Sequence, residues 1–318
     1  AGVFTYNNDI DRDESYRGEL TVGGGPPSAF AWIFDPDFAT TSKRSQRSIY
    51  LGATQSLTQR LSLDGALYWD RYTNTDTISG EQWLSSKLNP RLGLVYRPYA
   101  RHTFRLASYR YLFSLVPGRI DAVDIAGLDI YRGSSPGSLT TDHRLAYEYD
   151  WPTGFLQVEG FVSDVRDEQR SRDSSNLLLR NIINTERDGV GITLNQLAAK
   201  SMGLVAEYEY LDIADNQQNI NNRREEQARA ALTWINGFGI TLGAEALYRH
   251  LRFANRPADQ DYFLFNAFME FEFPRNLGKL SLQGNNLGDE NINWVTDAFV
   301  IDGRIPERNW IATLELYF

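Results

Sequence analysis

The chain has 318 residues, of which 42% are hydrophobic and 13% aromatic, and its formal net charge is −9. The absence of cysteine excludes disulfides, thiol catalysis and cysteine-ligated metal sites, and the three histidines lack the HxH or HxxxH spacing of a zinc site. The acidic balance argues against nucleic acid as a partner, and no run of about 18 apolar residues predicts a membrane-spanning helix.

Apolar residues recur with a period of two along most of the chain, which predicts β-strands with one apolar and one polar face. In the N-terminal part the pattern is weak and favours strands at about 1–8, 16–24 and 28–35. Farther along it is clear, as in LSLDGALYW at 61–69. The strands predicted there are 47–57, 60–72, 83–97, 101–113, 142–151, 154–167, 186–198, 201–213, 225–235, 239–253, 260–273, 277–288 and 306–318.

The connections between these strands alternate between short and long. Short turns fall at 57–60 and 236–239, whereas long polar segments fall at about 114–141 and 289–305. The alternation of apolar residues breaks at 173–189, which favours an extracellular loop. Long tilted strands joined by short periplasmic turns and long extracellular loops are typical of bacterial outer-membrane barrels.

The predicted fold is therefore a single all-β domain over 1–318, a transmembrane antiparallel up-and-down β-barrel in the outer membrane of a Gram-negative bacterium. Because both ends of the chain are expected on the periplasmic side, the number of strands is even, about sixteen with fourteen as the fallback. A barrel leaves no sheet edge in lipid, so the last strand is expected to pair with the first.

The chain closes with NWIATLELYF at 309–318, in which apolar residues alternate up to a terminal phenylalanine. This pattern resembles the C-terminal signal that the bacterial outer-membrane insertion machinery reads. The resemblance implies the barrel-assembly machinery as a partner. The residues that would form the signal are Trp310, Leu314, Leu316 and Phe318.

Other segments resemble barrel hairpins of TonB-dependent receptors. They are NPRLGLVYRPYARHTFRLASYRYLF at 89–113, and LSLQGNNLGDENINW at 280–294 followed by PERNWIATLELYF at 306–318. Those receptors have 22 strands and an N-terminal plug. This chain is long enough for about sixteen strands, and no plug sequence precedes them.

In length and strand number the chain is similar to the C-terminal porin domains of exopolysaccharide secretion proteins, which export Pel, poly-N-acetylglucosamine or cellulose. The resemblance rests on barrel size, the missing plug and the acidic balance. It implies preceding tetratricopeptide repeats, a periplasmic scaffold or lipoprotein partner, and a role in biofilm formation. Outer-membrane lipid and lipopolysaccharide are further expected partners.

The expected function is export of a polysaccharide, cationic or partly deacetylated, through an acidic lumen gated by the loops 114–141 and 168–185. The alternatives are a TonB-dependent-receptor-like barrel without its plug and a general diffusion porin. A porin would use 114–141, which carries Arg119, Asp121 and Asp124, as a constriction loop.

Alternation also predicts which charges line the lumen. An excess of carboxylates there would attract cationic solutes, unless the charges pair across strands and only solvate the wall. The carboxylates assigned to the lumen are Asp64, Asp70, Glu148, Asp150, Glu159, Glu207, Glu209, Glu245, Glu270, Glu272 and Glu315. The bases assigned to it are Arg91, Arg97, Arg229, Arg249 and Lys279.

Aromatic residues divide into two predicted groups. Those near strand ends would form interfacial girdles, and those facing inward would stack on sugars. The girdle residues are Trp151, Trp234, Trp310, Tyr96 and Phe273 on the periplasmic side and Tyr72, Tyr210 and Tyr248 on the outer side. The stacking candidates are Tyr68, Phe161, Phe268 and Tyr317.

Catalysis and metal binding are disfavoured. Acidic pairs two residues apart, such as Glu207 with Glu209, resemble a glycosidase pair but arise in any acidic barrel wall. His143 next to Asp142 would serve an outer-membrane hydrolase, yet no serine motif accompanies it. IDRDES at 10–15 lacks the glycine and the distal glutamate of a calcium loop. The sequence therefore predicts a channel that is not an enzyme and has no cofactor.

Overall fold

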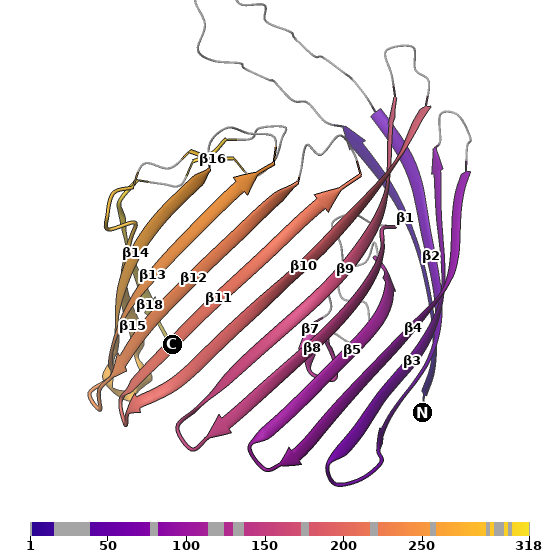
Figure 1. The fold of residues 1–318 in the computed structure, drawn as a ribbon. Helices are drawn as coiled ribbons and strands as arrows, with labels where there is room; N and C mark the ends of the chain where they lie inside the picture. The colour runs from indigo at the N-terminus through magenta and orange to yellow at the C-terminus, as the bar shows by residue number, and fades with distance from the viewer. Residues whose placement is uncertain are drawn as a thin grey trace, which may run out of the picture.

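The computed structural model describes residues 2–15, 39–76, 82–113, 124–129, 137–172, 178–216, 222–254, 259–290, 293–295, 302–304 and 307–317. Most of them form one antiparallel sheet of fourteen strands, which curves into a barrel wall (Figure 1). Its strands are β1 (Gly2–Ser15), β2 (Ala39–Ser56), β3 (Leu61–Asp76), β4 (Gln82–Tyr99), β5 (His102–Leu112), β8 (Leu139–Trp151), β9 (Gly154–Arg172), β10 (Leu178–Ala199), β11 (Met202–Asp215), β12 (Arg223–Ile235), β13 (Ile240–Phe253), β14 (Gln260–Glu272), β15 (Gly278–Asn285) and β18 (Asn309–Leu316).

Three smaller elements lie in the connections. β6 (Asp124–Ile125) pairs with β7 (Leu128–Asp129), and β16 (Asn293–Val295) pairs with β17 (Asp302–Arg304). A single 3-10 turn, η1 (Pro274–Asn276), joins β14 to β15. No helix in the described part of the chain has the length and apolarity to cross a membrane.

Each strand of the sheet pairs with its neighbour in sequence, except that β6 and β7 are skipped between β5 and β8, and β16 and β17 between β15 and β18. This confirms the all-β, antiparallel up-and-down fold. The sheet has the fallback number of strands, and the strands expected at 16–24 and 28–35 lie outside the described residues. β1 and β18 are the edges of the described sheet, and the expected pairing of last strand with first is not seen there.

The connections sort by length as the sequence predicts. Tight turns at 57–60, 152–153 and 236–239 gather at one end of the sheet, and the longer connections lie at the other (Figure 1). The prediction of a loop at 173–189 is wrong for most of its length, because β10 begins at Leu178 and pairs with β9 from there onward. At this end of the hairpin a strand need not show an apolar face, since it has left the lipid layer.

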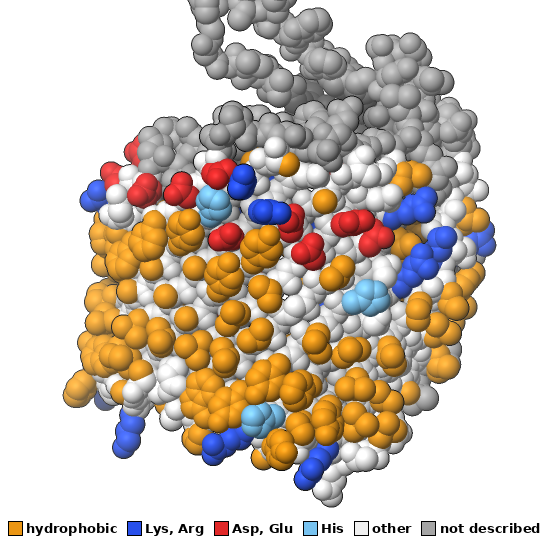
Figure 2. All heavy atoms as spheres, in the orientation of Figure 1, with side chains coloured by type: hydrophobic (Ala, Val, Ile, Leu, Met, Phe, Trp, Pro, Cys, Tyr) orange, Lys and Arg blue, Asp and Glu red, His pale blue; other side chains and the backbone are white. Residues whose placement is uncertain are grey.

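The two faces of the sheet differ in chemistry. Large apolar side chains on the convex face are open to the surroundings, among them Leu145 at 58%, Val162 at 61% and Leu88 at 54% exposure. Figure 2 shows them covering the wall below a band of acidic and basic side chains. A water-soluble protein would bury such side chains, whereas in a bilayer they face their own solvent. The convex face is therefore the lipid side.

Two girdle residues are wrongly assigned. Tyr72 is 1% exposed and lies on the inner side of β3, because Trp69, three residues earlier, faces lipid. Trp310, at 62% exposure, lies on the apolar face in register with Gly284, but it lies at the long-connection end of β18 and not at the short-turn end, the expected place of the periplasmic girdle.

Candidate functional site

The inner wall of the barrel is the candidate site, because it carries the polar residues that alternate with the lipid-facing ones. Glu207 and Glu209, for example, flank the lipid-facing Tyr208 on β11. The carboxylates and bases assigned to the lumen by alternation lie at inner-face positions of their strands, apart from Arg97, which falls at a β-bulge after Tyr96. Four arginines that sequence reasoning missed share this face, and they are Arg105, Arg144, Arg187 and Arg223.

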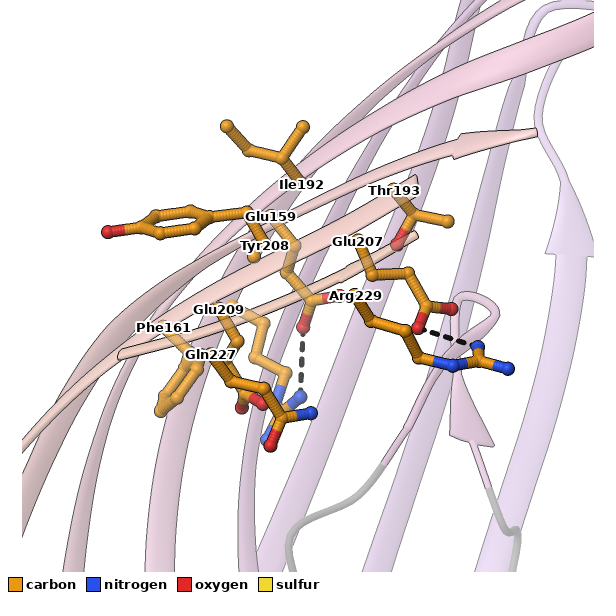
Figure 3. A pocket seen from close by; sticks show the side chains of 11 residues that line it. Glu159, Phe161, Ile192, Thr193, Glu207, Tyr208, Glu209, Gln227 and Arg229 are labelled. Carbon is orange, nitrogen blue, oxygen red and sulfur yellow. Dashed lines mark hydrogen bonds and ion pairs between the residues drawn. The ribbon is translucent and has the colours of Figure 1, made fainter. Parts of the chain in front are cut away.

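A bridging arginine stands at the centre of the inner wall. Arg229 on β12 donates from Nη1 to Glu207 Oε2 at 3.0 Å and from Nε to Glu245 Oε2 at 2.7 Å. Figure 3 shows Glu207 and Arg229 pointing toward each other on the same side of the sheet. Asn266 Nδ2 donates to the second oxygen of Glu245 at 3.2 Å, so the bridge spans the four neighbouring strands β11 to β14.

A second arginine bridge lies on β8 and β9. Arg144 donates from Nε to Asp142 Oδ1 at 2.9 Å and from Nη1 to Glu159 Oε1 at 2.8 Å. Its guanidinium also lies 5.0 Å from the centre of the Phe161 ring. Planar donors on a carboxylate and an aromatic face are the geometry that arginine satisfies and lysine does not.

Between the two bridges the wall is hollowed. A concavity of about 230 Å³ is lined by both arginines together with Thr193, Glu209 and Gln227. In Figure 3 the labelled side chains of Thr193, Glu209, Gln227 and Arg229 point away from Ile192 and Tyr208, which lie on the opposite side of the strands. Glu209 makes no ion pair within the described part of the chain, so the hollow offers one free carboxylate beside two paired arginines.

Further ion pairs continue this pattern toward both ends of the wall. Glu225 accepts hydrogen bonds from Arg223 Nε at 2.6 Å and Arg249 Nη2 at 2.7 Å. Lys279 Nζ lies 3.4 Å from Glu270 Oε1 and 4.0 Å from Glu315 Oε1. The wall is thus largely a ladder of cross-strand ion pairs, and its acidity is lower than the predicted carboxylates alone suggest.

The alternation of inward and outward residues along a strand could also have predicted the missed arginines. Arg144 lies four residues before Glu148 on one strand and therefore shares its face. Arg105 likewise shares a face with Thr103 and Ala107. Extending the alternation to bases with the same care as to carboxylates finds both residues.

Two of the assigned residues do not line an open lumen. Asp70 is 1% exposed and accepts hydrogen bonds from Ser48 Oγ and Asn89 Nδ2. Tyr68 is 3% exposed, stacked on Tyr50 at 5.0 Å between ring centres and covered by the Arg91 guanidinium at 3.7 Å. These contacts from the adjacent strands β2 and β4 leave the Tyr68 ring no free face for a sugar.

The other stacking candidates are more open. Phe268 is 37% exposed on the inner face of β14, and Tyr317 is 54% exposed and donates to Glu315 Oε2 at 3.2 Å. Phe161 is half-buried beneath Arg144. Among the predicted assembly-signal residues, the exposed ones on the lipid side are Trp310, Leu314 and Leu316, and Phe318 lies outside the described residues.

The pairing of Asp142 with His143 that a hydrolase would use does not form. Asp142 points inward to Arg144, whereas His143, the next residue, points outward and pairs its Nδ1 with Ser108 Oγ at 2.9 Å. Adjacent residues of a strand face opposite sides, so the carboxylate cannot orient this imidazole. Within the ranges that the structure describes, no cluster of three or more His, Asp or Glu side chains is arranged to hold a metal ion.

A family model described as "TonB dependent receptor-like, beta-barrel" matches residues 2–287. The chain belongs to this family. The smaller expected barrel size, which favoured an exopolysaccharide porin, is outweighed by a match over most of the chain. TonB-dependent receptor-like barrels lie in the outer membrane of Gram-negative bacteria, and they are transporters and receptors rather than enzymes.

Solved structures agree with this assignment at the level of the fold. The FrpB iron transporter from Neisseria meningitidis is 12% identical, with a TM-score of 0.66 over 86% of this chain and 44% of that one. A mutant of the ferric enterobactin receptor PfeA from Pseudomonas aeruginosa is 14% identical, with a TM-score of 0.68 over 99% of this chain and 50% of that one.

The ferric-catecholate import receptor Fiu from E. coli is 12% identical, with a TM-score of 0.59 over 88% of this chain and 46% of that one. The receptor-like barrel described here therefore spans half or less of the length of these proteins. No curated protein sequence matches it. Nothing in the comparisons supports a Pel, poly-N-acetylglucosamine or cellulose exporter or its periplasmic partners.

Proposed function

We propose that this receptor-like barrel forms part of the wall of an outer-membrane importer that takes up a metal chelate. The match to the TonB-dependent receptor-like barrel family over residues 2–287 carries the proposal. The solved structures of similar fold include importers of ferric chelates. Import replaces the polysaccharide export that the sequence favoured. It corresponds to the alternative of a TonB-dependent-receptor-like barrel.

The inner wall supplies chemistry suited to a polar, charged solute. The arginine bridges at Arg144 and Arg229 hold their guanidinium groups at fixed positions, since each is bound to two carboxylates on flanking positions. The free carboxylate of Glu209 lies in the hollow between them. We assign this hollow as a point where the solute contacts the wall during passage, with a preference for cationic groups near Glu209.

Uptake of radioactive iron supplied as different chelates tests this function. The protein is placed in the outer membrane of a host without chelate receptors of its own, with and without a functional TonB system. At least one chelate should enter only when both the protein and TonB are present. Uptake that is equal with and without the protein for every chelate tested contradicts the proposal.

A single substitution tests the assignment of the hollow as a contact point for the solute. Glu209→Gln should reduce uptake of the accepted chelate about tenfold, the factor that corresponds to one lost polar contact of about 1.4 kcal/mol. Asp188→Asn is the matched control, because Asp188 lies on the lipid side of β10 opposite Val162. Equal uptake by the two variants argues against the hollow as a contact point.

A further inference from the structure

The connection between β5 and β8 returns to the inner wall. Its described part, residues 124–129, is the β6–β7 hairpin, called the inner hairpin here. Arg105 Nη1 donates to the carbonyl oxygen of Ala126 at 2.9 Å, and the amide of Ala126 donates to Asp64 Oδ2 at 3.1 Å. Two charged wall residues on β5 and β3 thus hold both backbone groups of the residue at the tip.

The tip has a defined turn geometry. Ala126 and Gly127 have φ values of 55° and 73°, and positive φ at both central residues is the mark of a tight two-residue hairpin. The flanking Ile125 and Leu128 face each other across the turn. The hairpin is therefore a formed element with its own pairing.

The wall beneath the hairpin is shaped to receive it. Ile125 and Leu128 are 5% and 2% exposed and pack in one cluster with Val95 and Ala107 of the inner wall. A methyl group added at Gly93 would lie 2.6 Å from Ile125 Cγ2 and 3.0 Å from Ala126 Cβ. Gly93 and the side chains of this cluster thus form the inner wall directly beneath the hairpin, beside its charged anchors, whereas ion pairs line the wall on β8 to β14.

The hairpin also reaches deep into the barrel. The connection leaves β5 at Leu112, at the long-loop end, yet its tip contacts Asp64 and Arg105, which lie close to the short-turn ends of β3 and β5. Near the short-turn ends of the strands, the hairpin therefore covers the inner wall around Gly93 of β4.

We propose that the inner hairpin is a fixed constriction, docked on the β3–β5 wall by Asp64 and Arg105, which narrows the pore and confines solutes to the opposite wall at β8–β13. The docked hairpin covers the wall of β3 to β5, so the ion-pair wall with Arg144 and Arg229 is the one left open to passage. The inference goes beyond the proposed import function, because it holds for any solute that crosses the barrel.

A disulfide tests the docking. The chain has no cysteine, so engineered thiols have no native competitors. Gly93→Cys with Ala126→Cys, combined with Ile125→Ala to remove the Cγ2 atom that would lie 2.6 Å from a Cβ at Gly93, brings two Cβ atoms into contact and should form a disulfide on mild oxidation in the membrane-embedded protein. Gly191→Cys with Ala126→Cys and Ile125→Ala is the control, since no atom lies within 4 Å of a Cβ at Gly191. Equal cross-linking of the two pairs, or none in the first, overturns the docking.

Ion conductance in planar bilayers tests the constriction. Asp64→Asn with Arg105→Gln removes both anchors and should raise the conductance, whereas Asp150→Asn with Arg97→Gln makes the same charge changes on residues that do not touch the hairpin and should leave it near the wild-type value. Adding the Gly93→Cys and Ala126→Cys disulfide, together with Ile125→Ala, to the anchor variant should restore the wild-type conductance, and reduction should raise it again.

Each outcome decides a separate point. A conductance that is unchanged in the anchor variant, or not restored by the disulfide, overturns the constriction even if chelate uptake succeeds. A conductance that follows the disulfide supports the constriction even if no chelate is taken up. If the anchor variant fails to fold, its electrophoretic band no longer shifts on heating. The disulfide pair in the protein with both anchors intact then remains the test. Locking a docked hairpin leaves the conductance at the wild-type level, whereas locking a free hairpin lowers it.

Discussion

Arg229 carries one positive charge between two carboxylates of neighbouring strands, and that arrangement sets the local potential of the inner wall. Both partners, Glu207 and Glu245, bind it through separate nitrogens, so the guanidinium cannot turn toward one partner without losing the other. The side chains are about one-third exposed, and exposed pairs of this kind contribute only about 0–1 kcal/mol to stability. The main effect of the bridge is therefore on charge selectivity, since Arg229, which alternation assigns to the lumen, places a fixed cation between two carboxylates of the wall.

Replacing this arginine should change selectivity more than stability. Arg229→Leu leaves Glu207 and Glu245 without their shared cation and should shift the reversal potential, measured across a bilayer with unequal KCl concentrations, toward cation preference. Arg224→Leu is the control, because Arg224 lies on the same strand but on the opposite face, where it pairs with Asp212. An equal shift in both variants, or none in Arg229→Leu, contradicts the assigned role of the inner arginine.

Residue positions could be predicted only as far as alternation along one strand decides them. Alternation places Glu207 and Glu245 inward. It does not reveal that Asp70 is buried, since that depends on Ser48 and Asn89, which the register brings in from two other strands. Ion pairing is equally non-local: Arg144 meets Glu159 only because β8 and β9 pair in this register.

At the scale of the strand, β10 shows how strictly the two faces are separated. Ile192 lies on the lipid face, in register with Val158 and Tyr208, and the next residue, Thr193, lies on the inner face opposite Glu207. A charge at the first position enters hydrocarbon, whereas a charge at the second meets water and a carboxylate.

A pair of single substitutions on β10 measures this separation. Ile192→Arg should lower the free energy of folding into lipid by about 2–4 kcal/mol, the cost of a lipid-facing arginine near the bilayer centre. Thr193→Arg should change it little. Urea titration of folding into vesicles gives both values, and similar losses in the two variants contradict the lipid assignment of the convex face.

Elements were predictable where lipid contact imposes a pattern and unpredictable where it does not. The expected strand 239–253 matches β13 within one residue, because its whole length alternates. The upper part of β10 has left the lipid layer and lacks the pattern. The inner hairpin has no pattern of its own, since what holds it is Gly93 and two charged residues from distant strands.

For the whole molecule, the hydrocarbon layer requires that every backbone amide in a spanning strand be paired. β1 and β18 are the edges of the described sheet. In lipid their outer amides need partners as much as those of β12, which is paired on both sides.

Hydrogen exchange in lipid vesicles measures that requirement directly. The amides of β1 and β18 should be protected as strongly as those of β12, because unpaired groups in hydrocarbon cost several kcal/mol each. Solubilising the sample in a mild detergent serves as the comparison. Rapid exchange along the full length of either edge strand in vesicles contradicts the assignment of these strands to the membrane.

The order of strands in the sheet follows their order in the chain, and this has a consequence for how such a wall changes over evolutionary time. A hairpin can be added or lost between two neighbours while every other pairing keeps its partner, so circumference varies in steps of two strands. The inner hairpin between β5 and β8 illustrates a second kind of change. A segment added inside the barrel alters the width of the pore, while the number of strands in the wall stays the same.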